Sequence, residues 1–280
     1  MPARPEHAAF WRYVEAHAHY DRGRPRDFSN ARAALEEAIK TGPRTTWFRR
    51  LSRTAEELAG HHVSAGASHD ELFLAWDEWI RESGPRIERQ LSMARTKLAG
   101  SHDERSEALV ILARLAGAHA ELPPKTEQSA TDCRWQWITP RRSERRVWEV
   151  KTGKFDRLPR DDVNQLLGQI EVERKRAARA RVLGCLLTPV ADVEDDAAEA
   201  ARDKITLVHH GAAVRLFDLL ADRLNRYRNL WEDGRAEARG TARTTVEPLL
   251  PRAGWLGRLL SPSAGRVIDA ESITAVFPSG

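Results

Sequence analysis

Three side chains have the types and spacing of a metal-dependent hydrolytic site. Glu149 and Lys151 are one residue apart, so an extended strand places both on the same face. Asp132 lies earlier, near the start of the expected partner strand. Two carboxylates on one face can hold Mg²⁺ (or Mn²⁺), with a backbone carbonyl, waters and a substrate phosphate as further ligands. Such an ion polarises a phosphate ester and activates water, which Lys151 can position.

Alternating side chains predict the two strands that must position these residues. Residues 131–138 alternate polar and apolar side chains, a period of two that is typical of a half-buried strand. Residues 146–151 alternate in the same way. The segment 139–144 between them is polar and contains Pro140, which favours a turn. We therefore expect a hairpin that brings Asp132 toward Glu149.

The elements around the hairpin indicate a mixed α/β fold. A helix is expected from Ser101 to Ala116, with Gly117 as the residue that ends it. After the hairpin, periodicity and Pro/Gly punctuation predict further helices and strands. In order, these are a helix at about 161–180, a strand at 181–188, a helix at 194–201, a strand at 204–210 and a helix at 212–231. The predicted class is α/β (α+β), with an αββαβ core around one central mixed sheet.

The motif and this order together resemble the PD-(D/E)XK nuclease superfamily. The resemblance is carried by Thr131-Asp132 and by Val147-Trp148-Glu149-Val150-Lys151-Thr152-Gly153, and it covers about residues 101–230. Thr131 stands where the motif has proline. The resemblance implies a restriction-endonuclease-like fold, metal binding by Asp132 and Glu149, and a catalytic role for Lys151.

The resemblance also implies a biological setting. It predicts an Mg²⁺-dependent phosphodiesterase that acts on nucleic acid, with DNA favoured over RNA. Small nucleases of this superfamily serve repair, restriction or anti-phage defence, often beside a helicase or another motor. The chain has no Gly-rich phosphate-binding loop, so such a motor would have to be a partner.

Members of the superfamily often add a glutamate from the helix before the first strand. Here that helix offers Glu104 and Glu107. Glu104 lies in the first turn, where a capping box with Ser101 and the helix dipole are enough to explain a glutamate at this position. Glu107 lies beside a partly apolar surface, so it is predicted as a third metal ligand, although Arg114 could pair with it instead.

The helix after the hairpin resembles a second motif of RecB-like members, Q-x-x-x-Y. Gln165 begins the matching stretch, and Gln169 stands where the motif has tyrosine. The resemblance implies a role for Gln165 in the active site. However, the apolar residues of this helix cluster on the opposite side, which is also typical of solvated glutamines. Both interpretations remain open at this point.

Two basic clusters could contact a nucleic-acid backbone. One lies toward the end of the same helix and is predicted to bind phosphates: Arg174, Lys175, Arg176 and Arg179, followed by Arg181. The other lies at the hairpin turn: Arg141, Arg142, Arg145 and Arg146. A solvated basic face explains either cluster equally simply, and the helix dipole favours cations at a helix C-terminus.

The resemblance divides the chain into three regions. Residues 1–100 are expected to be an all-helical recognition or partner-binding region, 101–231 the nuclease-like domain, and 232–280 a C-terminal tail or small appendage. The helices expected in the first region are 6–20, 29–41, 44–60, 69–81 and 84–99. Its tryptophans are interpreted as core anchors: Trp11, Trp47, Trp76 and Trp79.

Composition excludes several classes of protein. The 280 residues are 41% hydrophobic and 31% charged, with a net charge of +4, which is typical of a globular protein and too mild to identify a nucleic-acid binder. The sequence lacks a membrane-spanning segment and a signal peptide, so a cytoplasmic protein is expected. Two cysteines exclude a disulfide framework. Cys185, in an apolar strand, is interpreted as a packed thiol.

Two alternatives to a nuclease remain at the level of sequence. The same fold could be a non-catalytic module that binds DNA or a partner protein. Glu149 could also form a structural ion pair with a neighbouring arginine in an unrelated α/β domain. The position of Asp132 relative to Glu149 discriminates between the enzyme and the ion pair, since only a metal site needs both carboxylates at one place.

Overall fold

The structure is a computed structural model that describes residues 10–15, 34, 37–38, 68–124, 131–138, 143–177, 180–231, 236–252, 254–262 and 266–278. The chain divides into two units, residues 1–63 with 138–143, and residues 64–137 with 144–280. In the first unit, residues 10–15 are helical and Tyr13 packs against Ala38. Most of the helices expected before residue 60, and Trp47, lie outside the described residues. Trp11 is exposed, so its interpretation as a core anchor is wrong.

The second unit is built on a six-stranded sheet whose strands follow one another in sequence order. β1 pairs antiparallel with β2, whereas β5 pairs parallel with both β4 and β6, so the sheet is mixed. The strands are β1 (His119–Glu121), β2 (Cys133–Ile138), β3 (Ser143–Val150), β4 (Ala180–Thr188), β5 (Ile205–His209) and β6 (Val267–Ile268). The expected α/β class with a mixed sheet is confirmed, and β1 is a further short strand.

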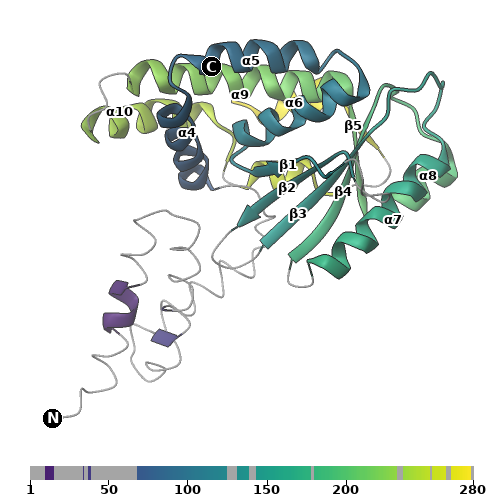
Figure 1. Ribbon diagram of the computed structural model, residues 1–280, viewed down its shortest axis with the longest axis horizontal. Helices are drawn as coiled ribbons and strands as arrows, with labels where there is room; N and C mark the ends of the chain where they lie inside the picture. The colour runs from purple at the N-terminus through teal and green to yellow at the C-terminus, as the bar shows by residue number, and fades with distance from the viewer. Residues whose placement is uncertain are drawn as a thin grey trace. The chain divides into compact units, whose positions relative to one another are not determined.

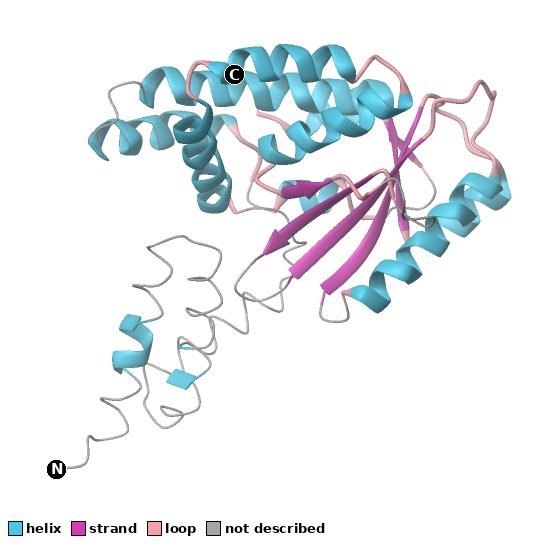
Figure 2. Ribbon diagram, in the orientation of Figure 1, coloured by secondary structure: helices cyan, strands magenta, loops and turns pink. Residues whose placement is uncertain are grey.

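Helices cover both faces of this sheet (Figure 1). They are α4 (His69–Ser83), α5 (Arg86–Lys97), α6 (His102–Leu115), α7 (Arg160–Arg176), α8 (Asp195–Ala201), α9 (His210–Trp231), α10 (Ala236–Val246), α11 (Trp255–Leu259) and α12 (Ala270–Val276). α5, α6 and α9 lie over one face, and α7 and α8 over the other (Figure 2). Two hydrophobic cores result, one on each side of the sheet.

The strand alternation assigns each side chain of the hairpin to one of these cores. Trp135 and Trp148 are buried in the core under α6 and α9, and their rings lie 4.5 Å apart. Val147 is buried in the core under α7. Because neighbouring side chains point to opposite faces, Glu149 lies on the α7 face like Val147. Asp132 precedes Cys133, which belongs to the α6 core, and so begins the α7 face of β2.

Capping residues determine where α6 begins and ends. The Ser101 side chain and Glu104 form the expected capping box, with Glu104 Oε2 accepting from the Ser101 backbone N–H at 2.7 Å. Gly117 follows the helix with φ of 70°, a left-handed conformation that favours glycine. The start of α6, with His102 and Arg105, therefore lies at the end of the sheet where β2 begins.

The structure on either side of the expected nuclease-like domain differs from the prediction. α4 and α5 belong to the same hydrophobic core as α6 and α9, with Trp76 and Trp79 buried in it as expected. Residues 232–280 are more than a loose tail, because β6 extends the sheet and Trp255, Leu260 and Phe277 are buried. These apolar residues are spread between prolines and glycines, so they form no periodic pattern that would have predicted their burial.

None of the helices in the described residues is long and apolar enough to cross a membrane.

Candidate functional site

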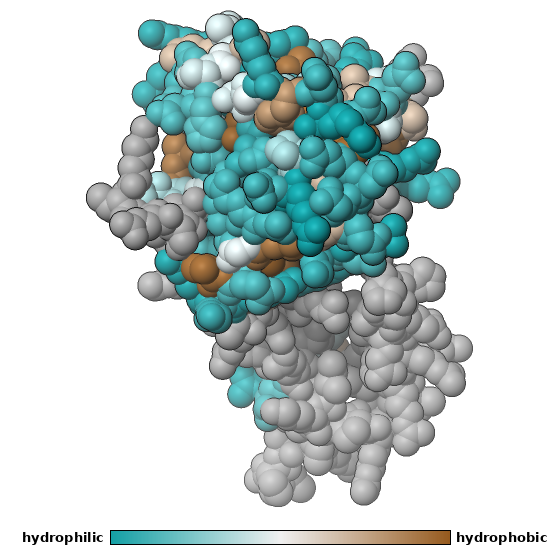
Figure 3. Space-filling model, turned by 90° about the vertical axis from the view of Figure 1, so that its right-hand side faces the viewer, coloured by the Kyte–Doolittle hydropathy of each residue, from teal (hydrophilic) through white to brown (hydrophobic). Residues whose placement is uncertain are grey.

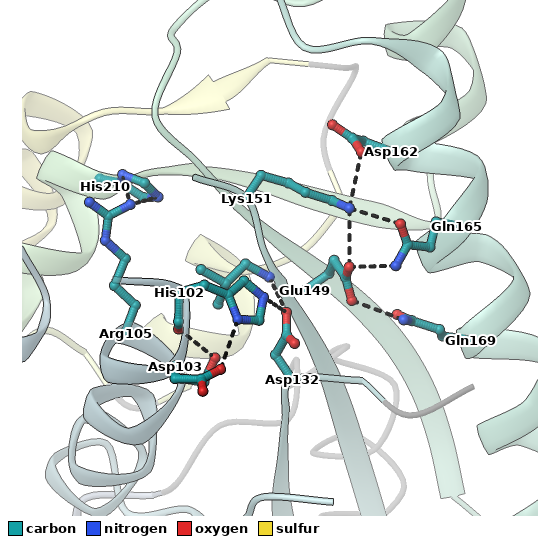
Figure 4. A network of polar contacts seen from close by, with 12 residues as sticks. His102, Asp103, Arg105, Asp132, Glu149, Lys151, Asp162, Gln165, Gln169 and His210 are labelled. Carbon is teal, nitrogen blue, oxygen red and sulfur yellow. Dashed lines mark hydrogen bonds and ion pairs between the residues drawn. The ribbon is translucent and has the colours of Figure 1, made fainter. Parts of the chain in front are cut away.

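Asp132 is held against β3 by two hydrogen bonds. Its backbone N–H donates to the Trp148 carbonyl at 2.9 Å, and its Oδ2 accepts from the Val150 N–H at 2.6 Å. These contacts place the carboxylate beside the Glu149-Val150-Lys151 segment (Figure 4). The hairpin therefore brings together the two carboxylates and the lysine singled out in the sequence.

Glu149 receives donors from α7 and from its own strand. Its side chain is almost fully buried, and Gln165 Nε2 donates to Oε1 at 2.7 Å. Gln169 Nε2 donates to Oε2 at 2.9 Å, and Lys151 Nζ lies 3.1 Å from Oε1. Gln165 and Gln169 thus face the sheet, and Gln169 is buried. The interpretation as a solvated glutamine is therefore wrong for Gln169, whereas Gln165 is exposed and still bonds to Glu149 and Lys151.

Lys151 connects the site to α7 and β4. Its Nζ lies 3.0 Å from Asp162 Oδ1 and donates to Gln165 Oε1 at 2.9 Å. Its backbone N–H donates to the Leu187 carbonyl of β4 at 2.8 Å. The ammonium is therefore held in a fixed position by two carboxylates and an amide. Asp162, in the first turn of α7, was not singled out as a site residue in the sequence.

Burial dominates the electrostatics of the half-buried Asp132 and the buried Glu149 and raises the pKa of both carboxylates. Burial raises the pKa of Asp132, against the opposing effects of the Val150 N–H and His102. Burial also raises the pKa of Glu149, and the charge of Asp132 raises it further, despite Gln169 and Lys151. Burial lowers the pKa of Lys151, but Asp162 and Glu149 outweigh that effect and raise it overall. A cation bound between Asp132 and Glu149 would stabilise both ionised forms.

The donor set suits a hard cation that keeps several waters. In the described part of the chain, no group of three or more His, Cys, Asp or Glu side chains is arranged to hold a metal ion. Asp132 and Glu149 would be the protein ligands of an ion held at this site, with water and substrate as its other ligands. Mg²⁺ binds in this way, through one or two carboxylates and substrate phosphates. The residues present thus fit Mg²⁺ or Mn²⁺.

The structure does not bring Glu107 to this site. Its exposed carboxylate pairs with Lys97 of α5, and the alternative partner Arg114 lies 3.9 Å from Glu82. The residue of α6 that reaches the site is His102, whose Nε2 lies 3.1 Å from Asp132 Oδ2. The first turn of α6 approaches the site, and Glu107 lies more than one turn further along the helix. In the sequence, the only indication of this role was that His102 directly follows Ser101, the cap residue of α6.

The predicted phosphate-binding residues lie at the end of α7. Arg174, Lys175 and Arg176 are exposed, and Arg176 lies 3.2 Å from Glu173. Figure 3 looks onto the side that carries α7 and α8 and shows mostly hydrophilic residues there. Arg176 follows Gln169 by about 10 Å of helix, so this cluster lies beyond the site along α7. Arg179 lies outside the described residues.

Arg145 and Arg146, the described members of the second basic cluster, are not part of a solvated face. Arg146 is buried and lies 2.7 Å from the buried Glu144, whereas Arg145 lies 2.8 Å from Glu173. Arg141 and Arg142 lie outside the described residues.

Cys185 is fully buried, and burial raises the pKa of its thiol to about 11. It is therefore a packed thiol, as expected.

The fold and site define a mixed α/β protein with two carboxylates and a lysine clustered at one end of the neighbouring strands β2 and β3. Comparisons with protein-family models, with curated proteins and with solved structures found no match to this chain. Its function must therefore be argued from the geometry of the site.

Proposed function

We propose that this protein is a nuclease that uses Mg²⁺ or Mn²⁺ to hydrolyse phosphodiester bonds, with DNA as the favoured substrate. The observation that carries the proposal is the convergence of Asp132, Glu149 and Lys151 at one end of the β2–β3 pair. A buried and a half-buried carboxylate whose pKa values are raised, beside a fixed ammonium, are suited to a cation and a phosphate rather than to an isolated ion pair. Glu149 pairs with a lysine of the site and with two glutamines of α7.

The order of elements supports a restriction-endonuclease-like fold. α6 is followed by β1, β2 and β3, then by α7 and β4. Apart from the short additional strand β1, this order of elements agrees with the αββαβ order that the resemblance to the PD-(D/E)XK superfamily predicts. The site lies between the hairpin and α7, where that resemblance puts the metal ligands and the catalytic lysine.

Each residue of the site has a distinct role in the proposed reaction. Asp132 and Glu149 hold the metal ion, which supplies charge stabilisation at the scissile phosphate and a water of lowered pKa. Lys151 positions the attacking water and offsets the negative charge that develops on the phosphate. Gln165 holds both Lys151 and Glu149, so it preserves their spacing. The resemblance extends the proposal to repair, restriction or anti-phage defence, with a helicase or other defence component as partner.

The first test is cleavage of DNA by the purified chain. We expect cleavage of plasmid or linear DNA in Mg²⁺ or Mn²⁺ and none in EDTA, because neither Asp132 nor Glu149 can activate water for this reaction unaided. Plasmid, linear duplex, single-stranded DNA and RNA should be compared in parallel. Asp132→Asn, which keeps the side-chain shape, should be inactive. Equal cleavage with and without EDTA, or by Asp132→Asn, would exclude the proposed mechanism.

The end of α7 is expected to contribute to DNA affinity. Replacing Arg174, Lys175 and Arg176 with serine should weaken binding equally for different sequences, because phosphate contacts carry no sequence information. The slope of log affinity against log salt should become shallower by as much as about 0.9 per lost contact with duplex DNA. Arg86→Ser/Arg89→Ser, on the exposed face of α5, is the control. An unchanged slope in the α7 variant would show that its cations are only solvated.

One observation favours the alternative of a non-catalytic binding module. Both oxygens of Glu149 already accept hydrogen bonds from α7 glutamines. A carboxylate satisfied in this way can serve structure alone. In that case, the chain would bind DNA or a protein with no metal-dependent turnover, and Asp132→Asn would leave binding intact.

A further inference from the structure

Arg105 and His210 form a second polar group beside the candidate site. Arg105 lies one turn after His102 on α6, and its Nη1 lies 2.7 Å from His210 Nδ1 at the start of α9. His210 also hydrogen-bonds to the backbone of Lys151. Figure 4 shows this pair on the side of Asp132 away from the α7 glutamines. The pair therefore borders the site on the side that α7 does not cover.

Arg105 has no carboxylate partner in the described part of the chain. Arg145 and Arg146 of β3 have ion pairs, but no Asp or Glu among the described residues lies within 4.0 Å of the Arg105 guanidinium nitrogens. Its Nε is buried without a hydrogen-bond partner. Burial lowers the pKa of Arg105, and no acidic group opposes that effect. A half-buried cation without a counter-charge is costly, so an anion is the expected complement.

His210 orients this guanidinium without adding charge. Burial, followed by the charges of Arg105 and His209, lowers the pKa of His210 to about 4. The imidazole is therefore neutral near pH 7 and accepts a hydrogen bond from Arg105. His209 is engaged elsewhere, since its Nδ1 accepts from the Gly211 N–H and its Nε2 lies 3.1 Å from the Pro189 carbonyl. Because Nε is buried, the donors that Arg105 keeps for a ligand are those of its two terminal nitrogens that His210 does not accept.

We propose that Arg105, oriented by His210, binds a phosphate group of the nucleic acid next to the phosphate that is cleaved. The proposal rests on the nuclease function and adds a subsite to it. Arginine matches phosphate with two parallel hydrogen bonds, and the pair borders Asp132 and Lys151, where the scissile phosphate would bind. The ligand is either an internal phosphodiester of the same strand or a terminal phosphate monoester, since both present the same oxygens.

The test measures DNA binding without cleavage. Wild type, Arg105→Gln, Arg105→Lys and the control Arg114→Gln, further along the same helix, are titrated with labelled duplex in Ca²⁺ in place of Mg²⁺. We expect Arg105→Gln to weaken binding at least about tenfold, because hydrogen bonds to charged groups are the strong ones. Its salt slope should fall by about 0.9. Arg105→Lys should bind more tightly than Arg105→Gln but less tightly than wild type, because lysine keeps the charge but lacks the two parallel donors of the guanidinium.

Two further arms identify the ligand and separate this proposal from the nuclease function. If Arg105→Gln loses more affinity for 5′-phosphorylated than for 5′-hydroxyl duplex, the ligand is a terminal phosphate. Equal losses of affinity assign an internal phosphate.

Inorganic phosphate should raise the Tm of wild type and not that of Arg105→Gln. That result without DNA cleavage would retain the subsite and reject the nuclease. Cleavage by wild type, together with Arg105→Gln binding as tightly as Arg114→Gln, would overturn the subsite alone. Absence of both DNA binding and phosphate stabilisation would overturn both proposals.

Discussion

Lys151→Ala is expected to lower the rate of metal-dependent DNA cleavage by about 10²–10³-fold, the cost of removing one preorganised group that stabilises developing charge. The ammonium is held by Asp162, Glu149 and Gln165 at 3.0, 3.1 and 2.9 Å. Its position is therefore set before substrate binds. Single-turnover rates at saturating Mg²⁺ measure the effect on the chemical step.

The control for this prediction is Lys154→Ala, which removes an exposed lysine from the segment that follows β3. Its rate should equal that of wild type. The Tm of Lys151→Ala must be measured as well, because Glu149 loses a counter-charge in this variant. Full activity of a folded Lys151→Ala protein would end the nuclease assignment. Loss of activity with an unchanged Tm would support the catalytic role.

Glu144→Gln is expected to give the largest loss of stability, about 3–5 kcal/mol in the free energy of unfolding. Glu144 and Arg146 are each 1% exposed, and two nitrogens of Arg146 lie 2.7 and 3.0 Å from Glu144 Oε1. Arg146 also donates to the Leu260 carbonyl, which accepts from Thr206 Oγ1 at 2.5 Å as well. Without Glu144, the Arg146 charge remains buried beside the segment that leads to β6.

Urea denaturation followed by circular dichroism measures this loss as a shift in midpoint at constant slope. The double variant Glu144→Gln/Arg146→Met removes both charges and keeps a long apolar side chain. It should therefore be more stable than Glu144→Gln alone, because the main penalty of the single change is an uncompensated buried charge. A double variant as unstable as the single one would contradict this account.

The sequence by itself determined the hairpin and the three residues that it carries. Polar and apolar side chains alternate in residues 131–138 and 146–151, and β2 and β3 are neighbouring strands in the structure. Alternation needs no knowledge of the rest of the fold, because one half-buried face is enough to set the direction of each side chain. The relation of Asp132 to Glu149 and Lys151 follows from this local rule.

Helix boundaries were also readable from local signals. The Ser101 and Glu104 capping box and Gly117 bracket α6 as expected. The interactions that decide these ends lie within a few residues of each other. In contrast, the role of Glu107 depends on which neighbouring helix lies against its side of α6. That neighbour is α5, with Lys97, and not the strand that carries Asp132.

Only the tertiary structure decided which residues surround the three site residues. His102, Asp162, Gln169 and Arg105 come from separate helices or separate turns, and their positions depend on how α6, α7 and α9 pack against the sheet. The burial of Trp255, Leu260 and Phe277 depends on the same packing. Strand alternation is a property of one segment, whereas helix docking sums many weak contacts between distant segments, so periodicity alone cannot encode its outcome.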